Sequence, residues 1–582
     1  MTNKPKILIL DADSSAGLAS IQALGSAGRE VHVGVRARGS LAESSRWPRS
    51  VHQQPDSLPM DGAISWLQEL DADYGFHLII PATESSLLWI RSFPEDHVVR
   101  KKSIVSCNAT IDTALNKETV LALAKSLGIP VPRSRLLTSH KAMESQWSFP
   151  TVLKPVRSKV ENGKHFKSYS VCIARNAEAK DLFLRKNLSH TDIQEQEWVA
   201  GSGVGVEVLY DCGKLVWHFV HRRLHEWPLT GGASSLRIAA PDNPVLVDYS
   251  RQLLDALQWH GVAMVEWRCT PDGKFYFIEL NPRLWGSLPL TIAAGVNIPE
   301  GLLLLSQGQK LPVSSSWDVG LSARNFAKDL TWTIANAKAD RCDKLLLTED
   351  PTTTIIGWLR ALTGREIWDG WSLKDPSVAI EDINRLLIRS IKIIRKNRKK
   401  EKTLRLARVQ YRKIFEEIQG GHFTVNSLLF ICYGNICRSP FASLIARSNV
   451  TENIKIESAG FYPEEGRMPP STAIQAAARF EVDLGAAVSK IVTNKHVSEA
   501  DLILVMDISN YELILKKFPD AINRTIFLGV FEKNDEIFEI SDPYDMSTDD
   551  TEIIFAEISR CVQKLGLAIN QGRREGVDSR QK

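Results

Sequence analysis

The C-terminal third of the chain contains the stretch LLFICYGNICRSP at residues 428–440. Its first four residues form an apolar run that predicts a buried strand. Pro440 suits the first turn of a helix, where a missing backbone N–H costs nothing. The loop between strand and helix points successive N–H groups inward, and with the positive helix N-terminus they make a cradle for an anion. The sequence therefore predicts an α/β unit with an anion-binding loop.

Two side chains of this cradle suit phosphoryl chemistry. Arg438 can hold two phosphate oxygens in a bidentate fork, which a lysine could not. Cys432 lies where the cradle favours a thiolate. A thiolate attacks phosphorus and gives a phosphocysteine, which water later hydrolyses. The alternative is a buried structural cysteine at the end of a strand.

The loop CYGNICRS and the segments after it resemble the low-molecular-weight protein-tyrosine-phosphatase family. Residues 458–460 (SAG), 501–507 (DLILVMD) and 541–544 (SDPY) match segments of that family. The resemblance covers residues 425–570 and implies a nucleophilic Cys432, a phosphate-clamping Arg438 and a general acid at Asp542. An acid is needed because the leaving phenolate must be protonated, and the same group then activates water. The residues implied to form or support the phosphate loop are Tyr433, Gly434, Asn435, Cys437, Ser439, Ser458 and Tyr544.

One position departs from the pattern of that family. The family has a histidine that hydrogen-bonds with the loop Asn and Ser, and this chain has Ala487 in its place. The rigidity of the loop is therefore in question, although its chemistry is not. The resemblance also implies that Cys437 traps an oxidised Cys432 as a reversible disulfide, since reactive exposed thiols oxidise readily. The alternative is that Cys437 is a packed small residue.

A second group of polar residues lies near residue 280. Glu279 and Asn281 are two positions apart on a predicted strand, so both side chains point to one face of the sheet. Glu266 comes from a neighbouring strand. Two carboxylates and an amide oxygen suit Mg²⁺, which bridges ATP phosphates while Lys154 neutralises others. Arg283 can hold the transferred phosphoryl group or an acyl phosphate.

This ordered set resembles the ATP-grasp superfamily, in its carboxylate–amine ligase and carbamoyl-phosphate-synthase-like branch. The matching segments are NK at 116–117, LGIPVP at 127–132, KP at 154–155, EWVAG at 197–201, VE at 265–266 and ELNPR at 279–283. The resemblance implies nucleotide contacts from Lys117, Glu197 and the backbone of Val199. It implies that ATP and a carboxylate give an acyl phosphate, which an amine-type nucleophile attacks. The alternative for any one of these residues is an ordinary polar face of an exposed strand.

The chain of 582 residues is too long for one hydrophobic core. All 15 tryptophans lie between Trp47 and Trp371, which indicates two modules of separate origin. We predict an α/β protein in four parts. These are a pre-ATP-grasp domain with a parallel sheet (1–110), an ATP-grasp domain (111–315), a mostly helical basic linker region (316–424) and a parallel-sheet phosphatase domain (425–570).

Residues 385–413 contain thirteen Lys or Arg against one acid, with Leu387, Ile388, Ile391 and Ile394 at helical spacing. The favoured interpretation is a solvated helical linker with one packed stripe. The alternative is a basic amphipathic helix that makes peripheral contact with anionic lipid or an acidic partner.

Charge and apolar patterning limit the class of protein. The formal net charge of +4 does not indicate nucleic-acid binding, and no apolar stretch reaches the roughly 18 residues of a membrane span. The apolar run near the N-terminus meets Asp11 and Asp13 at once, unlike a signal peptide. The eight cysteines are mostly far apart, which favours a reducing cytoplasm. The expected partners are a phosphorylated protein or small molecule for one site, and a carboxylate and an amine for the other.

Three other functions remain open. Arsenate reduction uses the same C-terminal scaffold but needs further cysteines, and after Cys437 only Cys561 follows. A phosphopeptide-binding module is a second possibility, although binding needs neither Cys432 nor Asp542. A third is that the N-terminal half is a nucleotide-binding regulatory module. The presence of the full set Glu266, Glu279, Asn281 and Arg283 argues against it.

Overall fold

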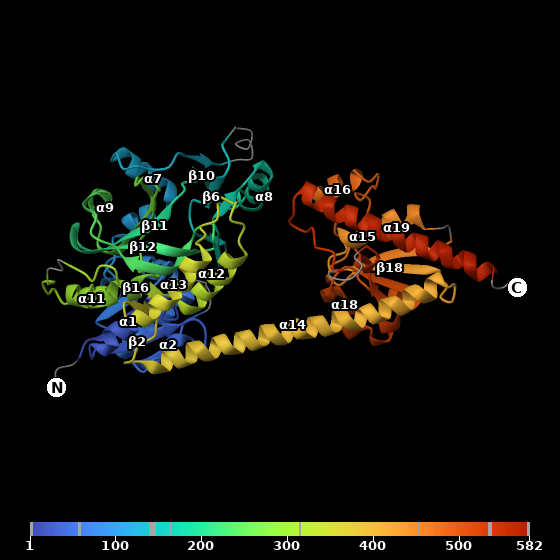
Figure 1. Ribbon diagram of the computed structural model, residues 1–582. Helices are drawn as coiled ribbons and strands as arrows, with labels where there is room; N and C mark the ends of the chain where they lie inside the picture. Colours follow the sequence, from blue (N-terminus) through green and yellow to red (C-terminus); the bar gives the residue numbers. More distant parts are fainter. Residues whose placement is uncertain are drawn as a thin grey trace. The chain divides into compact units, whose positions relative to one another are not determined.

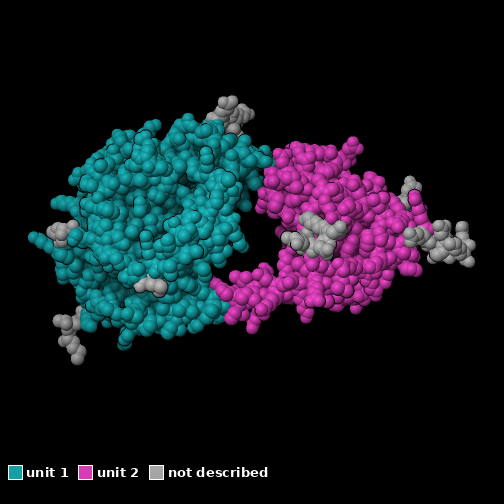
Figure 2. All heavy atoms as spheres, viewed as in Figure 1, with its two compact units in different colours: residues 1–388 teal, residues 389–582 magenta. Residues whose placement is uncertain are grey.

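The computed structural model describes residues 4–55, 60–138, 147–162, 165–312, 316–450, 453–532 and 538–578. The chain forms two compact units, Met1–Ile388 and Arg389–Lys582 (Figure 2). Each unit has a hydrophobic core built from its own residues.

Unit 1 begins with a four-stranded parallel sheet. Its strands are β1 (Lys6–Leu10), β2 (Glu30–Val35), β3 (Pro48–Gln53) and β4 (Leu78–Pro81), in the order β3-β2-β1-β4. Helix α1 (Ser15–Ser26) follows β1 almost at once, and Ser14 caps it by accepting the Gly17 N–H. A Cβ at Gly17 would lie 2.6 Å from the Ala12 Cα. Only glycine lets the helix begin this close to the strand.

Two mainly antiparallel sheets make up the rest of unit 1. The smaller has the order β5-β10-β6-β9, and the larger has the order β15-β14-β11-β12-β13-β16-β17 with only its last pair parallel. The strands of the smaller sheet are β5 (Ser134–Leu137), β6 (Thr151–Pro155), β9 (Cys172–Ala174) and β10 (Ile193–Glu197). Those of the larger are β11 (Ser202–Asp211), β12 (Lys214–Trp227), β13 (Ala233–Ala239), β14 (Gly261–Cys269), β15 (Phe275–Asn281), β16 (Ser322–Arg324) and β17 (Glu366–Trp368). The hairpin β7 (Lys159–Asn162) and β8 (His165–Ser168) is separate.

Short helices cover these sheets (Figure 1). They are α2 (Leu41–Ser44), α3 (Met60–Tyr74), α4 (Glu84–Ser92), α5 (Val98–Lys101), α6 (Asn108–Ala114), α7 (Lys117–Ser126), α8 (Ala177–Asn187), α9 (Pro244–Ala256), α10 (Leu288–Ala293), α11 (Ile298–Ser306), α12 (Phe326–Lys338) and α13 (Pro351–Arg360).

Unit 2 is a parallel sheet in the order β19-β18-β20-β21. Its strands are β18 (Ser427–Cys432), β19 (Lys455–Gly460), β20 (Leu502–Val505) and β21 (Thr525–Phe527), and its helices are α15 (Arg438–Asn449), α16 (Ser471–Ala478), α17 (Asn494–Glu499), α18 (Ile508–Lys517) and α19 (Thr548–Asp578). Every residue of β18 is buried, as expected for a central parallel strand. Helix α19 packs on α15 and α16, where the Phe441 and Phe555 rings stack 4.0 Å apart.

The long helix α14 (Pro376–Gln419) begins in unit 1, where Val378 is buried, and adds Ala407, Ile414 and Ile418 to the core of unit 2. Between these ends, residues 387–399 are all exposed. The favoured interpretation of a packed apolar stripe is therefore wrong for this segment.

The predicted fold class is confirmed: along the chain, one parallel sheet precedes an ATP-grasp-like antiparallel sheet, and a second parallel sheet follows the long helix. Part of the segment predicted as linker belongs to unit 1, because β16 and β17 complete its large sheet. Arg324 of β16 ties them together, with buried ion pairs to Asp329 and to Glu366 of β17. The division into four domains stays a prediction. Within the residues that the structure describes, no helix has the length and apolar character to cross a bilayer.

Candidate active sites

The first candidate site is the loop between β18 and α15. Strand β18 ends at Cys432 and helix α15 begins at Arg438, so the backbone turns sharply between them. Asn435 has a φ of 50°, a left-handed conformation that asparagine tolerates better than most residues. A Cβ at Gly460 of β19 would lie 2.7 Å from the Tyr433 carbonyl oxygen. The shape of the loop therefore depends on the residue types at positions 435 and 460.

The Asn435 side chain holds the loop together. Its Nδ2 donates to Ser439 Oγ at 2.9 Å and to Ser458 Oγ at 3.1 Å, and its Oδ1 accepts the Lys490 N–H at 2.8 Å. Ala487, which replaces the expected histidine, is half-buried against the core. The loop thus has its own hydrogen-bond network without that histidine.

Cys432 lies at the base of the loop and is 3% exposed. Its Sγ accepts the Asn435 N–H at 3.1 Å and lies 3.0 Å from Ser439 Oγ. Both contacts direct the sulfur toward the centre of the loop. This is the place from which a nucleophile would attack a bound phosphoryl group.

Arg438 forms the wall of the loop and is 2% exposed. Its Nη1 donates to Asp507 Oδ2 at 2.7 Å and to the Ile540 carbonyl at 3.0 Å, and its Nη2 donates to Asp542 Oδ2 at 2.6 Å. Burial opposes the charged form, but the neighbouring sulfur and carboxylates outweigh it and hold the pKa of Arg438 above its ordinary value. Among the described residues its buried Nε has no hydrogen-bond partner. A fixed cation with one free N–H suits an anion in the loop.

Exposed aromatic side chains surround the mouth of the loop. Tyr433 is 48% exposed and meets Tyr462 edge to face at 6.0 Å, and Tyr544 is 57% exposed. The Arg467 guanidinium lies 3.7 Å from the centre of the Tyr462 ring and donates to the Gly434 carbonyl. Flat aromatic walls of this kind suit an aryl substrate.

The sequence analysis gave no role to Asp507, Tyr462 or Arg467. Asp507 closes the quoted segment DLILVMD, yet nothing in that segment indicates that its carboxylate faces Arg438. Tyr462 and Arg467 lie in a turn-rich segment without a motif.

Cys437, the second cysteine of the loop, is 3% exposed. Burial, and after it the nearby Cys432 and Asp542, raise the pKa of its thiol. The thiol is therefore protonated at neutral pH and is a weak nucleophile in this state. Its role as a redox trap stays a prediction.

The second candidate site lies on strands β14 and β15. Glu266 and Glu279 are paired across the two strands, and Asn281 Nδ2 donates to Glu266 Oε1 at 2.9 Å and to Glu279 Oε1 at 3.3 Å. Burial opposes ionisation of Glu279, but Lys117 and Lys154 outweigh it and hold its pKa below the ordinary value. The structure thus brings the three predicted metal ligands together. Two carboxylates and an amide fit Mg²⁺, provided that Asn281 presents its Oδ1.

Lys154 lies beside this acidic group on β6. It is buried, and its Nζ donates to Gln196 Oε1 at 2.7 Å. Burial lowers the pKa of Lys154 to about 8, although Glu279 and Glu266 partly offset the effect. Lys117, at the start of α7, donates to Ser158 Oγ at 2.6 Å. Two lysines next to ionised carboxylates make a suitable place for polyphosphate with a divalent cation.

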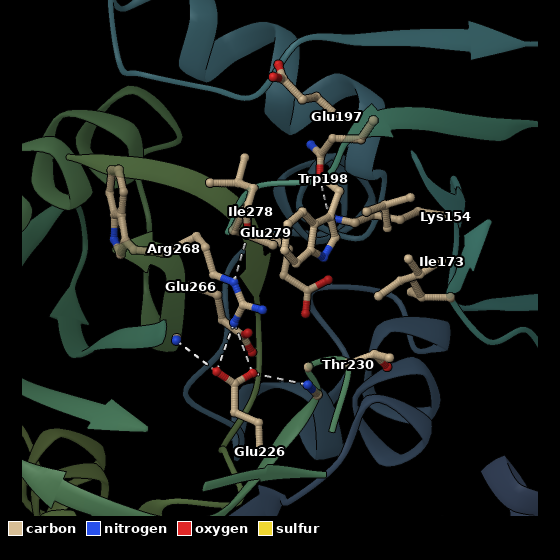
Figure 3. Close-up of a pocket in the computed structure, with 18 of the residues that line it drawn as sticks. Lys154, Ile173, Glu197, Trp198, Glu226, Thr230, Glu266, Arg268, Ile278 and Glu279 are labelled. Atoms are coloured by element: carbon tan, nitrogen blue, oxygen red, sulfur yellow. Dashed lines mark hydrogen bonds and ion pairs between the residues drawn. The ribbon is translucent and has the colours of Figure 1, made fainter. Parts of the chain in front are cut away.

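A cavity of about 200 Å³ opens between the two antiparallel sheets (Figure 3). Lys154, Glu266 and Glu279 line its polar end, and Glu197 and Val199 lie on its wall. The apolar wall consists of Val152, Val171, Ile173, Trp198 and Ile278. An apolar slot that leads to cations and carboxylates has the form expected of a nucleotide site.

Two arginines that the sequence analysis missed complete this cavity. Arg223 Nη2 lies 2.6 Å from Glu266 Oε2. Arg268 Nη1 lies 2.8 Å from Glu226 Oε1 (Figure 3). Glu226 also accepts the backbone N–H of Gly203 and Gly232. Arg223 and Glu226 lie in the strand-like segment HRRLHEW, which contains no family signature.

A second cavity of about 310 Å³ lies on the other side of the acidic group, and both cavities share Arg223, Glu266 and Glu279. Arg283 and Lys328 line it with Ser15, Ser287 and Asn325. Arg283 Nη2 also donates to Asn281 Oδ1 at 3.1 Å. The predicted residue Arg283 therefore lines this second cavity rather than the nucleotide slot.

His221 lies on the wall of the second cavity. Its Nδ1 lies 2.9 Å from Glu207 Oε1 without a hydrogen bond between them, and the Glu207 carboxylate accepts hydrogen bonds from Ser287 and Thr291. Glu207, Ser287 and Thr291 are buried. A histidine held by a buried carboxylate beside a polar cavity can take a proton from a bound group.

Two family models match separate parts of the chain. "Low molecular weight phosphotyrosine protein phosphatase" matches residues 427–575, and "ATP-grasp in the biosynthetic pathway with Ter operon" matches residues 195–328. The first match contains the phosphate loop, and the second contains Glu266, Glu279, Asn281 and Arg283, but Lys117, Lys154 and part of the lining of both cavities lie outside it.

The chain is similar to curated phosphatases over unit 2. The probable low molecular weight protein-tyrosine-phosphatase AmsI of Erwinia amylovora is 32% identical over 140 residues, which are 24% of this chain and 94% of that protein. The low molecular weight protein-tyrosine-phosphatase Wzb of Escherichia coli K12 is 29% identical over 145 residues, which are 25% of this chain and 96% of that protein. A solved L-amino acid ligase from Bacillus licheniformis matches 54% of this chain and 79% of its own at 15% identity, with a TM-score of 0.41.

Proposed function

We propose that this chain is a two-enzyme protein, because unit 2 belongs to the low-molecular-weight protein-tyrosine-phosphatase family and unit 1 carries an ATP-grasp domain. Unit 2 hydrolyses aryl phosphate monoesters of the phosphotyrosine type. Unit 1 joins a carboxylate to an amine-type nucleophile with ATP. The observation that carries the first activity is the Cys432–Arg438–Asp542 geometry around one anion loop.

In the phosphatase reaction, the loop N–H groups and Arg438 bind the phosphoryl oxygens and orient phosphorus toward Cys432. The Cys432 sulfur attacks phosphorus as the P–O bond to the leaving group breaks, and Asp542 gives its proton to the leaving oxygen. Asp542 is 51% exposed at its side chain and lies at the mouth, where that oxygen emerges. In the second step Asp542 takes a proton from water, which attacks phosphorus and releases phosphate and the sulfur.

The test is hydrolysis of 4-nitrophenyl phosphate by the full chain, beside Cys432→Ser. We expect turnover by wild type and only background with Cys432→Ser. Equal rates for the two proteins would refute the assignment. Turnover of arsenate with a thiol reductant, without aryl phosphate hydrolysis, would favour the reductase alternative. Binding of phosphotyrosine peptide without turnover would favour a binding module.

In the ligase reaction, the apolar slot binds the adenine and ribose, with Glu197 and the Val199 backbone at their polar edges. Lys117, Lys154 and Arg268 hold the phosphates. Mg²⁺, held by Glu266, Glu279 and Asn281, would neutralise phosphate charge when bound. Arg283 would then hold the substrate carboxylate in the second cavity, within reach of the γ-phosphate.

The second cavity also gives a place for the nucleophile. His221, oriented by Glu207, would take a proton from the incoming amine as it attacks the acyl phosphate and releases phosphate. The test is ADP formation by wild type and Glu279→Gln with a panel of carboxylates and amines. We expect ADP release that depends on both a carboxylate and an amine and is lost in Glu279→Gln. ATP binding without any product in the panel would favour the regulatory-module alternative.

The remaining parts of the proposal concern domains and location. We propose a pre-ATP-grasp domain (1–110), an ATP-grasp domain (111–315) and a phosphatase domain (425–570), with 316–424 between them. None of the eight cysteines, all of which lie in the described residues, forms a disulfide. This supports a reducing compartment such as the cytoplasm.

A further inference from the structure

The segment that carries Asp542 has no regular secondary structure. Residues 538–543 belong to no helix or strand. Their backbone is held at Ile540, whose N–H donates to the Met506 carbonyl at 2.8 Å and whose carbonyl accepts Arg438 Nη1 at 3.0 Å. The direction of the Asp542 side chain therefore depends on what holds the other residues of this segment.

Glu539 joins this segment to two helices. Its Oε1 accepts the N–H of Ile508, the first residue of α18, at 3.1 Å, and its Oε2 pairs with Lys400 Nζ of α14. The residue before Ile508 is Asp507, whose Oδ2 accepts Arg438 Nη1. Glu539 thus connects α14 to the start of α18, where one of the two carboxylates that hold Arg438 lies.

Helix α14 makes further contacts in this region. Two turns after Lys400, the Arg408 guanidinium lies 5.4 Å from the centre of the Phe538 ring, which is buried. Positions 400 and 408 lie within about 80° of one another on the helix surface. On an adjacent side of the helix, Gln410 Oε1 accepts the Tyr511 O–H of α18 at 3.2 Å. We call residues 400–410 of α14 the bracing segment.

The bracing segment lies outside the family domain, because α14 ends at Gln419 and the family match begins at residue 427. Lys400 adds little buried area, since its side chain is 44% exposed, whereas Ala407 of the same segment is buried in the core. An ion pair of this exposure contributes little to stability. What the Lys400 ion pair restricts is the position of Glu539.

We propose that the bracing segment positions Asp542 for proton transfer, with Lys400 acting through Glu539. This inference rests on the proposed phosphatase function of unit 2. Lys400 is a positioning residue, because its ion pair restricts the segment that leads to Asp542 and does not reach the phosphate loop. The Asp542 carboxyl must come within hydrogen-bond reach of the leaving oxygen, and a small displacement of such a group slows a reaction.

The test measures kcat/KM of the full chain and of Lys400→Gln for phenyl phosphate and for 4-nitrophenyl phosphate. For phenyl phosphate we expect a loss of about two- to fivefold, the factor that a half-exposed ion pair contributes. For 4-nitrophenyl phosphate the value should stay close to that of wild type, because its phenolate leaves without a proton. Inhibition by inorganic phosphate should be unchanged, because the phosphate loop keeps its contacts.

Further variants separate positioning of Asp542 from a general structural effect. In the Asp542→Asn background, Lys400→Gln should cause no further loss, since no proton donor remains to be positioned. Glu539→Gln should give the same loss as Lys400→Gln, and K400Q/E539Q should lose no more than either single variant. Lys400→Arg keeps the charge and should restore most of the wild-type value.

The matched control is Lys396→Gln. This change removes an exposed lysine one turn earlier on α14, which forms no ion pair within the part of the chain that the structure describes. It should behave as wild type does with both esters.

Three results would overturn the proposal while wild type is active. One is an unchanged rate of Lys400→Gln with phenyl phosphate. Another is an equal proportional loss with both esters, which would assign Lys400 to the stability of the domain. The third is a full further loss in the Asp542→Asn background. If wild type hydrolyses neither ester, the proposed phosphatase function itself fails, and this inference fails with it.

Discussion

At the scale of single residues, the position of Asp542 decides how the phosphatase depends on its leaving group. The carboxylate faces Arg438 at the mouth of the loop. We expect Asp542→Asn to lower kcat for phenyl phosphate by about 10²–10⁴-fold. The loss for 4-nitrophenyl phosphate should be smaller, because its phenolate leaves without a proton. Steady-state kinetics with the two esters measures this difference.

Asp520→Asn, an exposed carboxylate away from the loop, is the control and should leave both rates unchanged. An equal loss for both esters with Asp542→Asn would mean that Asp542 positions Arg438 instead of transferring a proton.

Lys154 gives a pH dependence to nucleotide binding. Because burial lowers its pKa to about 8, the empty site loses this cation as the pH rises through that value. Bound phosphates favour the charged form, so ATP binding above pH 8 should take up a proton. Calorimetry in buffers of different ionisation enthalpy measures the uptake. Lys154→Met should abolish it and weaken ATP binding, and uptake that persists in this variant would assign the proton to another group.

The sequence predicted the main residues of both sites, but not the side chains that pair with those residues. Cys432, Arg438 and Asp542 stand in short segments whose spacing reports the chemistry. Asp507 meets Arg438, and Arg223 meets Glu266, only after strands distant in the sequence are brought together, and no local pattern reports such contacts. The placement of Arg283 in the second cavity depends on the turn after β15, which spacing alone does not specify.

At the scale of elements, the phosphate loop depends on Asn435 and not on the absent histidine. Asn435→Ala would leave Ser439, Ser458 and the Lys490 N–H without this partner. We expect a loss of about 1–3 kcal/mol in the free energy of unfolding of unit 2. Urea titration with and without inorganic phosphate measures this loss. Phosphate should stabilise wild type more than the variant, because the variant must also order the loop.

Asn494→Ala changes an exposed asparagine of α17 and should leave the unfolding curve unchanged. If Asn435→Ala behaves in the same way, the loop is held by its backbone alone.

The strand predicted from the apolar run before Cys432 and the helix predicted at Pro440 agree with β18 and α15. The region after residue 316 was the hardest to predict. Strands β16 and β17 have three residues each, and the whole segment 325–365 separates them in the chain. Their pairing therefore leaves no periodic signal in the sequence.

At the scale of the whole molecule, the C-terminal part of α14 belongs to the phosphatase core. Ala407, Ile414 and Ile418 are each at most 3% exposed in that core. We expect a fragment that begins at residue 400 to be more stable than one that begins at 425. The loss should be several kcal/mol, since removal of one buried Ile side chain costs about 2–5 kcal/mol.

Thermal unfolding of the two fragments, followed by aryl phosphate hydrolysis, measures the difference. The single variant Ile418→Ala in the longer fragment is the matched control and should fall between the two. Equal stability of both fragments would contradict the contribution of α14 to this core.

The run of exposed basic residues in α14 has a consequence for the lifetime of the protein. Residues 387–399 are all exposed and include six Lys or Arg, the residues after which trypsin-like proteases cleave. A cut there would leave the cores of both units complete, since the buried positions of α14 lie on either side. One proteolytic event would therefore give two polypeptides, each with a complete core, and the two domains would no longer be covalently joined.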